Sequence, residues 1–181
     1  ISIPIADAFS GRDFDETVIH RHLPTFPLDK DGQGNAHVSF AFAAHRAVVD
    51  VDEELGLVRV VEVATSQDVG RVLNPVQARG QIEGGITQGL GLAILEEIIL
   101  KDGIIQNANF TDYLLPTALD TPEIQIAALI EEPEPGAPFG AKGIGEPPVI
   151  SSTPAIVAAI RNATGLDLAR VPVRPEDIAL G

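Results

Sequence analysis

The sequence of 181 residues contains no cysteine, no methionine and no tryptophan, and it is poor in basic side chains. Without cysteine the chain can form no disulfide, and it can hold neither thiolate-bound zinc nor an iron–sulfur cluster. Its 12 lysines and arginines stand against 26 acidic residues, which gives a net charge of −14. Because nucleic acids and anionic membranes are bound through clustered positive charge, we expect neither as a partner.

Long hydrophobic runs are also missing. The longest stretch without charge, residues 147–160, is too short and too rich in proline to cross a bilayer. No secretion signal is visible at the N-terminus, so we expect a cytoplasmic protein. The chain opens on Ile1 without an initiator methionine, and we therefore expect an excised, processed or partial product.

Aliphatic side chains must supply the core, because 45% of the residues are hydrophobic while only 4% are aromatic. Two runs, residues 36–52 and 57–66, alternate loosely between apolar and polar side chains, and the acidic turn 52–56 joins them. This pattern predicts a β-hairpin. We expect a second, short hairpin around residues 101–103 and a further strand over residues 123–131.

Two helices are expected. Asn74 is a suitable N-cap and Pro75 a suitable first helical residue, so the first helix should run from there to about Glu97. The second should begin at Thr153-Pro154 and end near Gly165.

These elements predict an α+β fold in which antiparallel hairpins pack on two main helices as a two-layer sandwich. Along the chain, residues 1–35 form an irregular N-terminal segment, residues 36–165 the core and residues 166–181 an extended tail.

The first predicted helix carries an unusual number of glycines: Gly80, Gly84, Gly85, Gly89 and Gly91. Each costs a helix about 0.5–1 kcal/mol relative to alanine, so the set forfeits roughly 3–5 kcal/mol and needs a compensating close approach. Gln81, Gly84 and Gln88 share one helical face. The side-chain amides of the two glutamines could bind a polar ligand on this face. Alternatively, the face serves tight helix–helix packing, with the glutamines at the rim of the contact.

Residues 139–148 read FGAKGIGEPP, in which three glycines precede Glu146 and two prolines follow it. A following proline disfavours the helical region, so we expect an extended backbone at Glu146. A flexible cradle ending in a stiffened carboxylate suits a site that needs a general base. The alternative is an ordinary surface loop with a solvated glutamate. It is not a Walker phosphate loop, because Gly143 follows Lys142 where that motif requires serine or threonine.

The segment GAKGIGEPP resembles the active-site loop of the large subunit in the xanthine dehydrogenase and aldehyde oxidase family, the molybdenum hydroxylases. A second stretch, from Asn74-Pro75 through GQIEGG at residues 80–85 and QGLG at residues 88–91 to Glu96-Glu97, resembles another signature of the same subunit. The two occur in the family's order and at about its spacing. The resemblance extends roughly over residues 34–161 and corresponds to the C-terminal part of such a subunit.

The resemblance implies that Glu146 is the general base in the hydroxylation of a heterocycle or an aldehyde with water as the oxygen source. It implies that Gln81 contacts the molybdopterin cofactor and that Ile144, with Gly143 and Gly145, touches it through the backbone. We expect no metal ligand from the protein. A surface ion pair explains Lys142 as well as any site role does.

The expected cofactor is molybdenum–molybdopterin, with the cytosine dinucleotide form as one alternative, and iron–sulfur clusters and FAD are expected on other domains or subunits. Expected partners are those modules, the remaining molybdopterin-binding domains, a small-molecule substrate and a second copy in a homo-oligomer. The upstream parts of the cofactor site are absent here, so we expect an oxidoreductase fragment that is inactive alone. A non-catalytic assembly or binding module of the same fold is the alternative.

Other polar clusters are expected to be structural. His20 and His22 alternate but have no third ligand at a suitable spacing. Residues 29–34 imitate the start of a calcium loop but lack its final glutamate. His45 is expected to be an ordinary hydrogen-bonded strand residue, and the family suggests structural packing for Tyr113.

Overall fold

The computed structural model describes residues 3–9, 11, 13 and 15–181, which divide into two compact units, residues 1–38 and 39–181. In the first unit the described residues form one short helix, α1 (Ile5–Ala8), and are otherwise irregular. The second unit contains the remaining elements and all of the predicted site residues.

A three-stranded sheet in the order β1-β2-β5 forms one layer of this unit. The predicted hairpin is confirmed: β1 (Ala43–Asp52) pairs antiparallel with β2 (Leu57–Asp68), with a bulge at residues 48–49. β5 (Glu123–Ile130) is the predicted third strand, but it runs parallel to β2. The sheet is therefore mixed and not built from hairpins alone.

Two helices form the second layer. α2 (Pro75–Ile94) begins as predicted, with the side chain of Asn74 accepting a hydrogen bond from the backbone N–H of Gln77 at 3.1 Å. α3 (Pro147–Thr164) begins six residues before the predicted start, because two successive prolines open it and its interior accommodates Pro154. Proline needs no hydrogen-bond partner for its nitrogen in a first helical turn, so this pair is a valid helix start.

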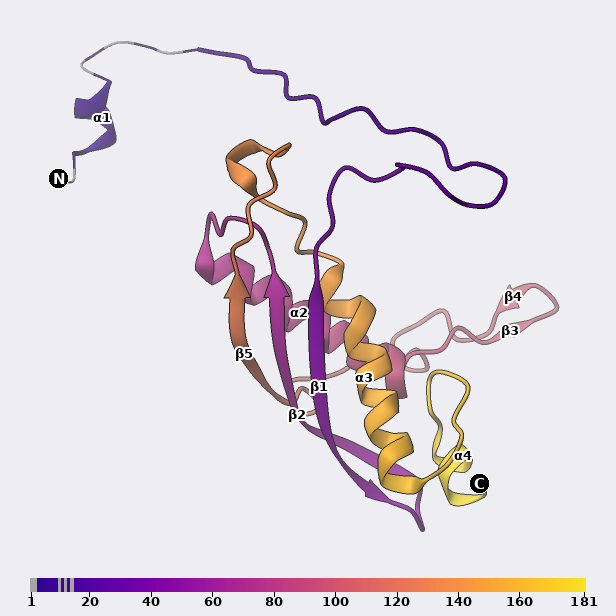
Figure 1. Cartoon of the computed structure of the whole chain (residues 1–181). Coiled ribbons are helices and arrows are strands. Elements are labelled where there is room, and N and C mark those ends of the chain that lie inside the picture. The colour runs from indigo at the N-terminus through magenta and orange to yellow at the C-terminus, as the bar shows by residue number, and fades with distance from the viewer. Residues whose placement is uncertain (1–2, 10, 12, 14) are drawn as a thin grey trace. The chain divides into compact units, whose positions relative to one another are not determined.

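The core lies between the sheet and the two helices. In Figure 1, α2 crosses behind the strands and α3 runs alongside β1. Side chains from both layers meet in one buried cluster; its most enclosed members are Val63, Ile82, Ile86, Leu90, Ala93, Ile156 and Ile160. The predicted α+β fold is thus confirmed.

The C-terminal residues correct the expectation of an extended tail. They include a short helix, α4 (Pro175–Ala179), and Leu168, Val173 and Ile178 join the core cluster. The backbone N–H of Val173 donates to the carbonyl oxygen of Ala93 at 2.8 Å. Prolines at 172 and 175 suggested an extended chain, but burial of these apolar side chains decides the local conformation.

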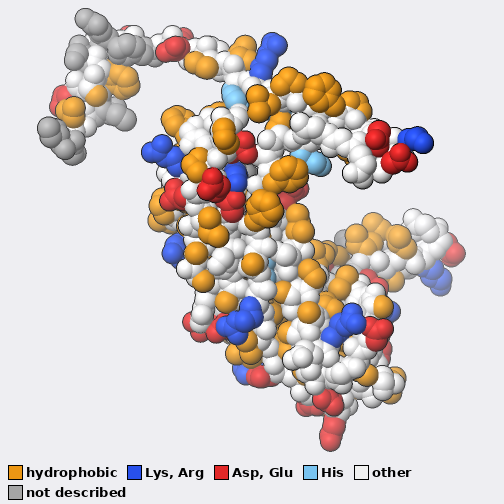
Figure 2. Space-filling view, in the orientation of Figure 1, with side chains coloured by type: hydrophobic (Ala, Val, Ile, Leu, Met, Phe, Trp, Pro, Cys, Tyr) orange, Lys and Arg blue, Asp and Glu red, His pale blue; other side chains and the backbone are white. Residues whose placement is uncertain are grey.

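The second predicted hairpin is also confirmed, as β3 (Leu100–Lys101) paired with β4 (Ile104–Ile105). Across the face shown in Figure 2, lysine and arginine side chains are scattered among acidic and hydrophobic ones and form no continuous patch. No helix among the described residues combines the length and the apolar character that a membrane crossing requires.

Candidate functional site

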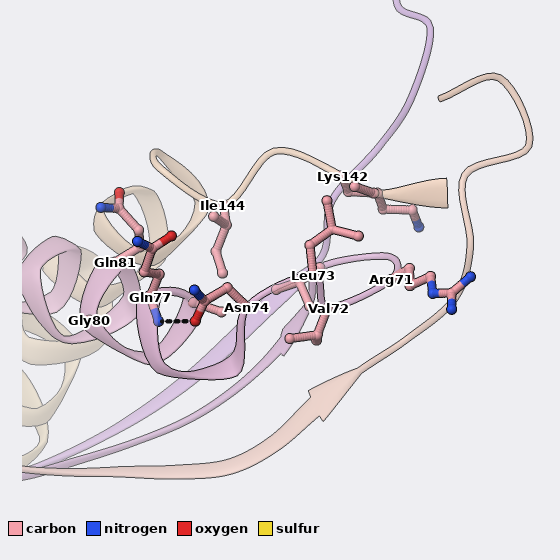
Figure 3. A pocket seen from close by; sticks show the side chains of 12 residues that line it. Arg71, Val72, Leu73, Asn74, Gln77, Gly80, Gln81, Lys142 and Ile144 are labelled. Carbon is pink, nitrogen blue, oxygen red and sulfur yellow. Dashed lines mark hydrogen bonds between the residues drawn. The ribbon is translucent and has the colours of Figure 1, made fainter. Parts of the chain in front are cut away.

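An open cavity of about 720 Å³ lies where the end of β2, the start of α2 and the loop before α3 come together. Gln81 and Ile144, two of the predicted site residues, both line it. Figure 3 shows the side chain of Ile144 extending from its loop toward the start of α2, where Gln77 lies in the first turn and Gln81 in the second. The other lining residues are Val69, Arg71, Val72, Leu73, Asn74, Ala78, Gly80, Ala141 and Lys142.

The cavity's loop is fastened at one end by a buried ion pair. Lys142 Nζ lies 2.6 Å from Asp68 Oδ2, and only 7% and 8% of the two side chains are exposed. The backbone N–H of Gly70 donates to the other carboxylate oxygen at 3.1 Å, and the backbone N–H of Lys142 donates to the Val69 carbonyl at 3.0 Å. The expected surface ion pair at Lys142 is therefore wrong, since this pair is enclosed and joins the loop to β2.

The environment of Asp68 stabilises its charged form. Burial by itself raises the pKa of this carboxyl, but hydrogen bonds from Lys142 and Gly70, with the lysine charge, outweigh burial and hold the pKa below its ordinary value. Asp68 consequently remains ionised beside the ammonium group.

At its other end the loop is held by packing of α3 on α2. A Cβ added to Gly85 would lie 2.7 Å from Pro148 Cβ, so the glycine allows the first turn of α3 to lie directly against α2. One turn further, Ser152 occupies the equivalent space beside Gly89, and the Thr153 hydroxyl donates to the Gly89 carbonyl at 2.9 Å. These two glycines allow the close approach by another part of the chain that the glycine content of this helix predicted.

Glu146 is the N-cap residue of α3 and has helical dihedral angles, φ −95° and ψ −36°. The expected extended backbone is wrong here, because the residue is already drawn into the helix that begins at Pro147. Its side chain is exposed, and it does not line the cavity that Gln81 and Ile144 share. Gly143 and Gly145, also exposed, lie between the two anchors and do not line the cavity either.

A second group of glycines faces open space. A Cβ added to Gly80, Gly84, Gly143 or Gly145 would meet nothing within 4 Å, and none of these four has a positive φ. Packing within the described chain therefore does not require glycine at these positions. A surface without side chains at these glycines lets a bulky polar cofactor approach the backbone closely. The backbone N–H groups and the glutamine side-chain amides could then contact the cofactor directly.

Sequence reasoning missed Asn74 and Gln77 as lining residues. Both could have been found from spacing, since Gln77 precedes Gln81 by one helical turn and Asn74 caps that turn. It also missed the burial of Asp68, for which the sequence carries no signal. Within the described residues, no three histidine, aspartate or glutamate side chains gather in a way that could hold a metal ion.

Two other sequence expectations hold. The Tyr113 hydroxyl donates to Glu96 Oε2 at 2.6 Å, and this hydrogen bond to a carboxylate is the main reason why the pKa of Tyr113 is raised. The carboxylate of Glu96 lies in the space that a Cβ at Gly91 would need. Tyr113 thus has a structural role, and His45 is a hydrogen-bonded strand residue.

Residues 5–122 match the family model of a molybdopterin cofactor-binding domain. The chain is 37% identical over 138 residues to the putative xanthine dehydrogenase molybdenum-binding subunit XdhA of Escherichia coli (strain K12), covering 75% of this chain and 18% of that protein.

Solved structures are also similar. Quinoline 2-oxidoreductase from Pseudomonas putida 86 matches with a TM-score of 0.71 and 39% identity over 76% of this chain and 18% of that one. The aldehyde oxidoreductase from Desulfovibrio desulfuricans ATCC 27774 matches with a TM-score of 0.80 and 30% identity over 87% of this chain and 17% of that one. The chain therefore spans less than a fifth of the length of these proteins.

Proposed function

Since the chain belongs to the molybdopterin-binding family of xanthine dehydrogenase and aldehyde oxidoreductase large subunits, we propose that it forms one wall of a molybdenum hydroxylase site and supplies the general base. The complete enzyme would hydroxylate a small heterocycle or an aldehyde with oxygen from water. The observation that supports the wall most directly is the cavity between α2 and the loop before α3, lined by Gln81 and Ile144, and Glu146 follows on the same loop.

The residues that would hold the cofactor are those around this cavity. Gln81 offers an amide that both donates and accepts, and the backbone at Ile144, with Gly143 and Gly145, is free of side-chain obstruction. Gly80 and Gly84 leave the facing surface of α2 equally open. When bound, the molybdenum cofactor supplies the two-electron oxidation, and the protein supplies positioning and proton transfer.

Glu146 is proposed to take the proton. Its carboxylate is exposed within the described chain, and its backbone is held between the Lys142–Asp68 ion pair and the packing of Pro148 on Gly85. A base fixed at both ends of a short loop can be brought within hydrogen-bond reach of a reacting group without a large conformational search. The rest of the subunit would close the site over it.

The Glu146→Gln substitution in the complete enzyme tests this role. We expect kcat to fall by about 10²–10⁴-fold, because general-base catalysis contributes on that order. Molybdenum content, measured by mass spectrometry on the purified protein, should be unchanged. Turnover would be measured with a panel of N-heterocycles and aldehydes and an artificial electron acceptor.

Glu54→Gln is the matched control, since Glu54 lies exposed in the β1–β2 turn far along the sheet from the loop. It should leave both measurements unchanged. Retained turnover in the Glu146→Gln enzyme would instead favour the alternative, a non-catalytic module that contributes only assembly.

The cofactor form and the partners extend this proposal. The molybdopterin would be present as such or as its cytosine dinucleotide, and electrons would leave through iron–sulfur and FAD modules on other domains or subunits. A chain without cysteine cannot itself ligate a cluster through thiolates, so any such cluster would lie outside it. The assembled enzyme is proposed to be a cytoplasmic homo-oligomer, and the isolated chain is proposed to be inactive.

A further inference from the structure

His45 belongs to a hydrogen-bonded chain that links the sheet to α3. Its Nδ1 lies 2.8 Å from the Ser151 hydroxyl on α3, and its Nε2 lies 3.1 Å from Nε2 of Gln67 on β2. Gln67 is 1% exposed and also lies 2.8 Å from the Thr65 hydroxyl. The function proposed above does not use any of these groups.

The donors and acceptors in this row of hydrogen bonds determine which ring nitrogen of His45 carries the proton. The Thr65 hydroxyl donates to the Ala44 carbonyl at 3.1 Å, so its oxygen must accept from the amide nitrogen of Gln67. The second hydrogen of that nitrogen points to His45 Nε2, which must then be an unprotonated acceptor. His45 is therefore neutral with its proton on Nδ1, which donates to Ser151.

Ser151 connects this row of hydrogen bonds to the start of α3. It lies one turn after Pro147 on the same helical face, and Glu146 is the N-cap of that turn. The carbonyl of Glu146 accepts from the N–H groups of Val149 and Ile150 at 3.0 and 3.2 Å, so the carboxylate-bearing residue moves with the turn.

The first turn of α3 is held from two sides. Toward α2 it packs tightly, through Pro148 on Gly85. Toward β1 it borders a hollow of about 270 Å³, lined by Pro147, Ile150, Ser151 and residues 41–43. Beside this hollow, the hydrogen bond between His45 and Ser151 joins the turn to β1.

We infer that His45 is a positioning residue, which in its neutral form fixes the first turn of α3 and thereby the carboxylate of Glu146. The inference rests on the proposed function of Glu146. Protonation would place an Nε2–H against the amide hydrogens of Gln67, and Gln67 can reverse its amide only if the Thr65 hydroxyl gives up its hydrogen bond to the Ala44 carbonyl. The Nδ1–H to Ser151 remains in the charged ring, but the contact of Nε2 with Gln67 becomes repulsive, so acid should displace the imidazole from β2 and loosen the turn with it.

Burial also opposes the charged form of His45, and it lowers the pKa of this half-buried side chain from the ordinary 6.5. The unfolded chain then takes up a proton at a higher pH than the folded chain. The anchor is accordingly intact above pH 6.5 and is lost as the pH falls from 6.5 through the lower pKa of the folded protein.

Charged groups on the sheet do not share the inner face with His45. Arg46 pairs with Glu62, and Arg59 pairs with Asp50, all on the opposite, solvent-facing side. At the end of β2, Asp68 forms its ion pair with Lys142.

On α3 the charged groups are Glu146, exposed at the N-cap, and Arg161, which lies ten positions beyond Ser151 and pairs with Asp167. The imidazole is thus the titrating group that faces this junction among the described elements.

The first measurement is the tautomer. In the ¹⁵N-histidine-labelled chain at pH 8, we expect the NMR spectrum of His45 to show a proton on Nδ1 and an unprotonated Nε2, with titration below pH 6.5. A proton on Nε2, or a pKa above 6.5, would overturn the inference independently of any enzyme assay.

The second measurement is the pH profile of kcat in the complete enzyme. The wild type should lose activity on the acid side at the pKa measured for His45, and His45→Gln, which cannot titrate, should lack that loss. At pH 8, Ser151→Ala should lower kcat by about 10- to 100-fold with little change in KM, because the base is misplaced while binding surfaces remain. Ser151→Thr keeps the hydroxyl and should restore activity.

His20→Gln, at an exposed histidine of residues 1–38, is the matched control and should keep the wild-type profile. An acid limb that persists unchanged in His45→Gln overturns the inference, as does full activity in Ser151→Ala. If Glu146→Gln also remains active, the proposed function fails as well; if it is inactive, only the role of His45 is refuted.

Discussion

Lys142 and Asp68 are buried as a pair, with 7% and 8% of their side chains exposed. Removing two charges from water is costly, and it is offset here by a 2.6 Å contact and by the Gly70 N–H on the second carboxylate oxygen. The pair joins the loop before α3 to the end of β2. At the scale of single residues it is therefore one of the two contacts that hold the loop beside the cavity.

Substituting Lys142 by methionine should leave a buried carboxylate without its partner. We expect the free energy of unfolding to fall by about 3–5 kcal/mol at pH 7, as measured by urea denaturation. Lys101→Met, at an exposed lysine of β3, should change it little.

The same pair supplies an internal test. The double substitution Lys142→Met with Asp68→Leu should be less destabilising than Lys142→Met alone, since no uncompensated charge remains. The deficit of the single variant should also shrink as the pH falls toward about 4, because without the lysine burial raises the pKa of the Asp68 carboxyl and the carboxyl takes up a proton. Additive losses at pH 7 would contradict the structural account.

At the scale of elements, α2 has two neighbouring glycines, of which one faces another helix and the other faces open space. Gly85 faces Pro148 of α3 across the packed interface, whereas Gly84 faces open space. The sequence shows five glycines with the same apparent helix penalty, and only their surroundings separate them into packing glycines and surface glycines.

The two substitutions to alanine should therefore differ in sign. Gly85→Ala forces Pro148 away and should reduce stability by about 1–3 kcal/mol, as overpacking does. Gly84→Ala should raise the stability of the isolated chain by about 0.5–1 kcal/mol, because alanine favours the helix.

In the complete enzyme, however, Gly84→Ala should lower molybdenum content if this face lies against the cofactor. Thermal unfolding of the chain and metal analysis of the enzyme measure the two effects separately. Equal destabilisation by both substitutions would refute the division of the glycines.

At the scale of the whole unit formed by residues 39–181, the C-terminal residues complete the core. Ile178 is 5% exposed and Val173 3% exposed, and both belong to the same cluster as the side chains of α2 and α3. Arg174 adds a polar connection, with Nε donating to Glu97 at 2.9 Å. Gly56, in the β1–β2 turn, makes room for the backbone of Pro175.

Ile178→Ala should consequently destabilise the chain as a core substitution does, by about 2–5 kcal/mol in chemical denaturation. Leu180→Ala is the matched control, because Leu180 lies two residues away and is 84% exposed. Similar, small effects of the two changes would mean that the C-terminal helix is not part of the cooperative unit.

The sequence by itself determined the elements that have strong local signals. Alternation and an acidic turn predicted the β1–β2 hairpin, and Asn74-Pro75 predicted the start of α2, because side-chain period and capping chemistry act over a few residues. The composition excluded cysteine ligation within the chain, and the two family-like motifs led to the family. None of these conclusions required knowledge of distant contacts.

Only the tertiary structure decided the parallel pairing of β5, the helical start at Pro147 and the burial of the C-terminal helix. It also decided that Asp68 meets Lys142, 74 positions away, and that His45 meets Ser151, 106 positions away. Such partners are brought together by burial of the common core, which depends on the whole chain. Local sequence preferences carry no record of it, because they concern only the residues within one turn or one strand.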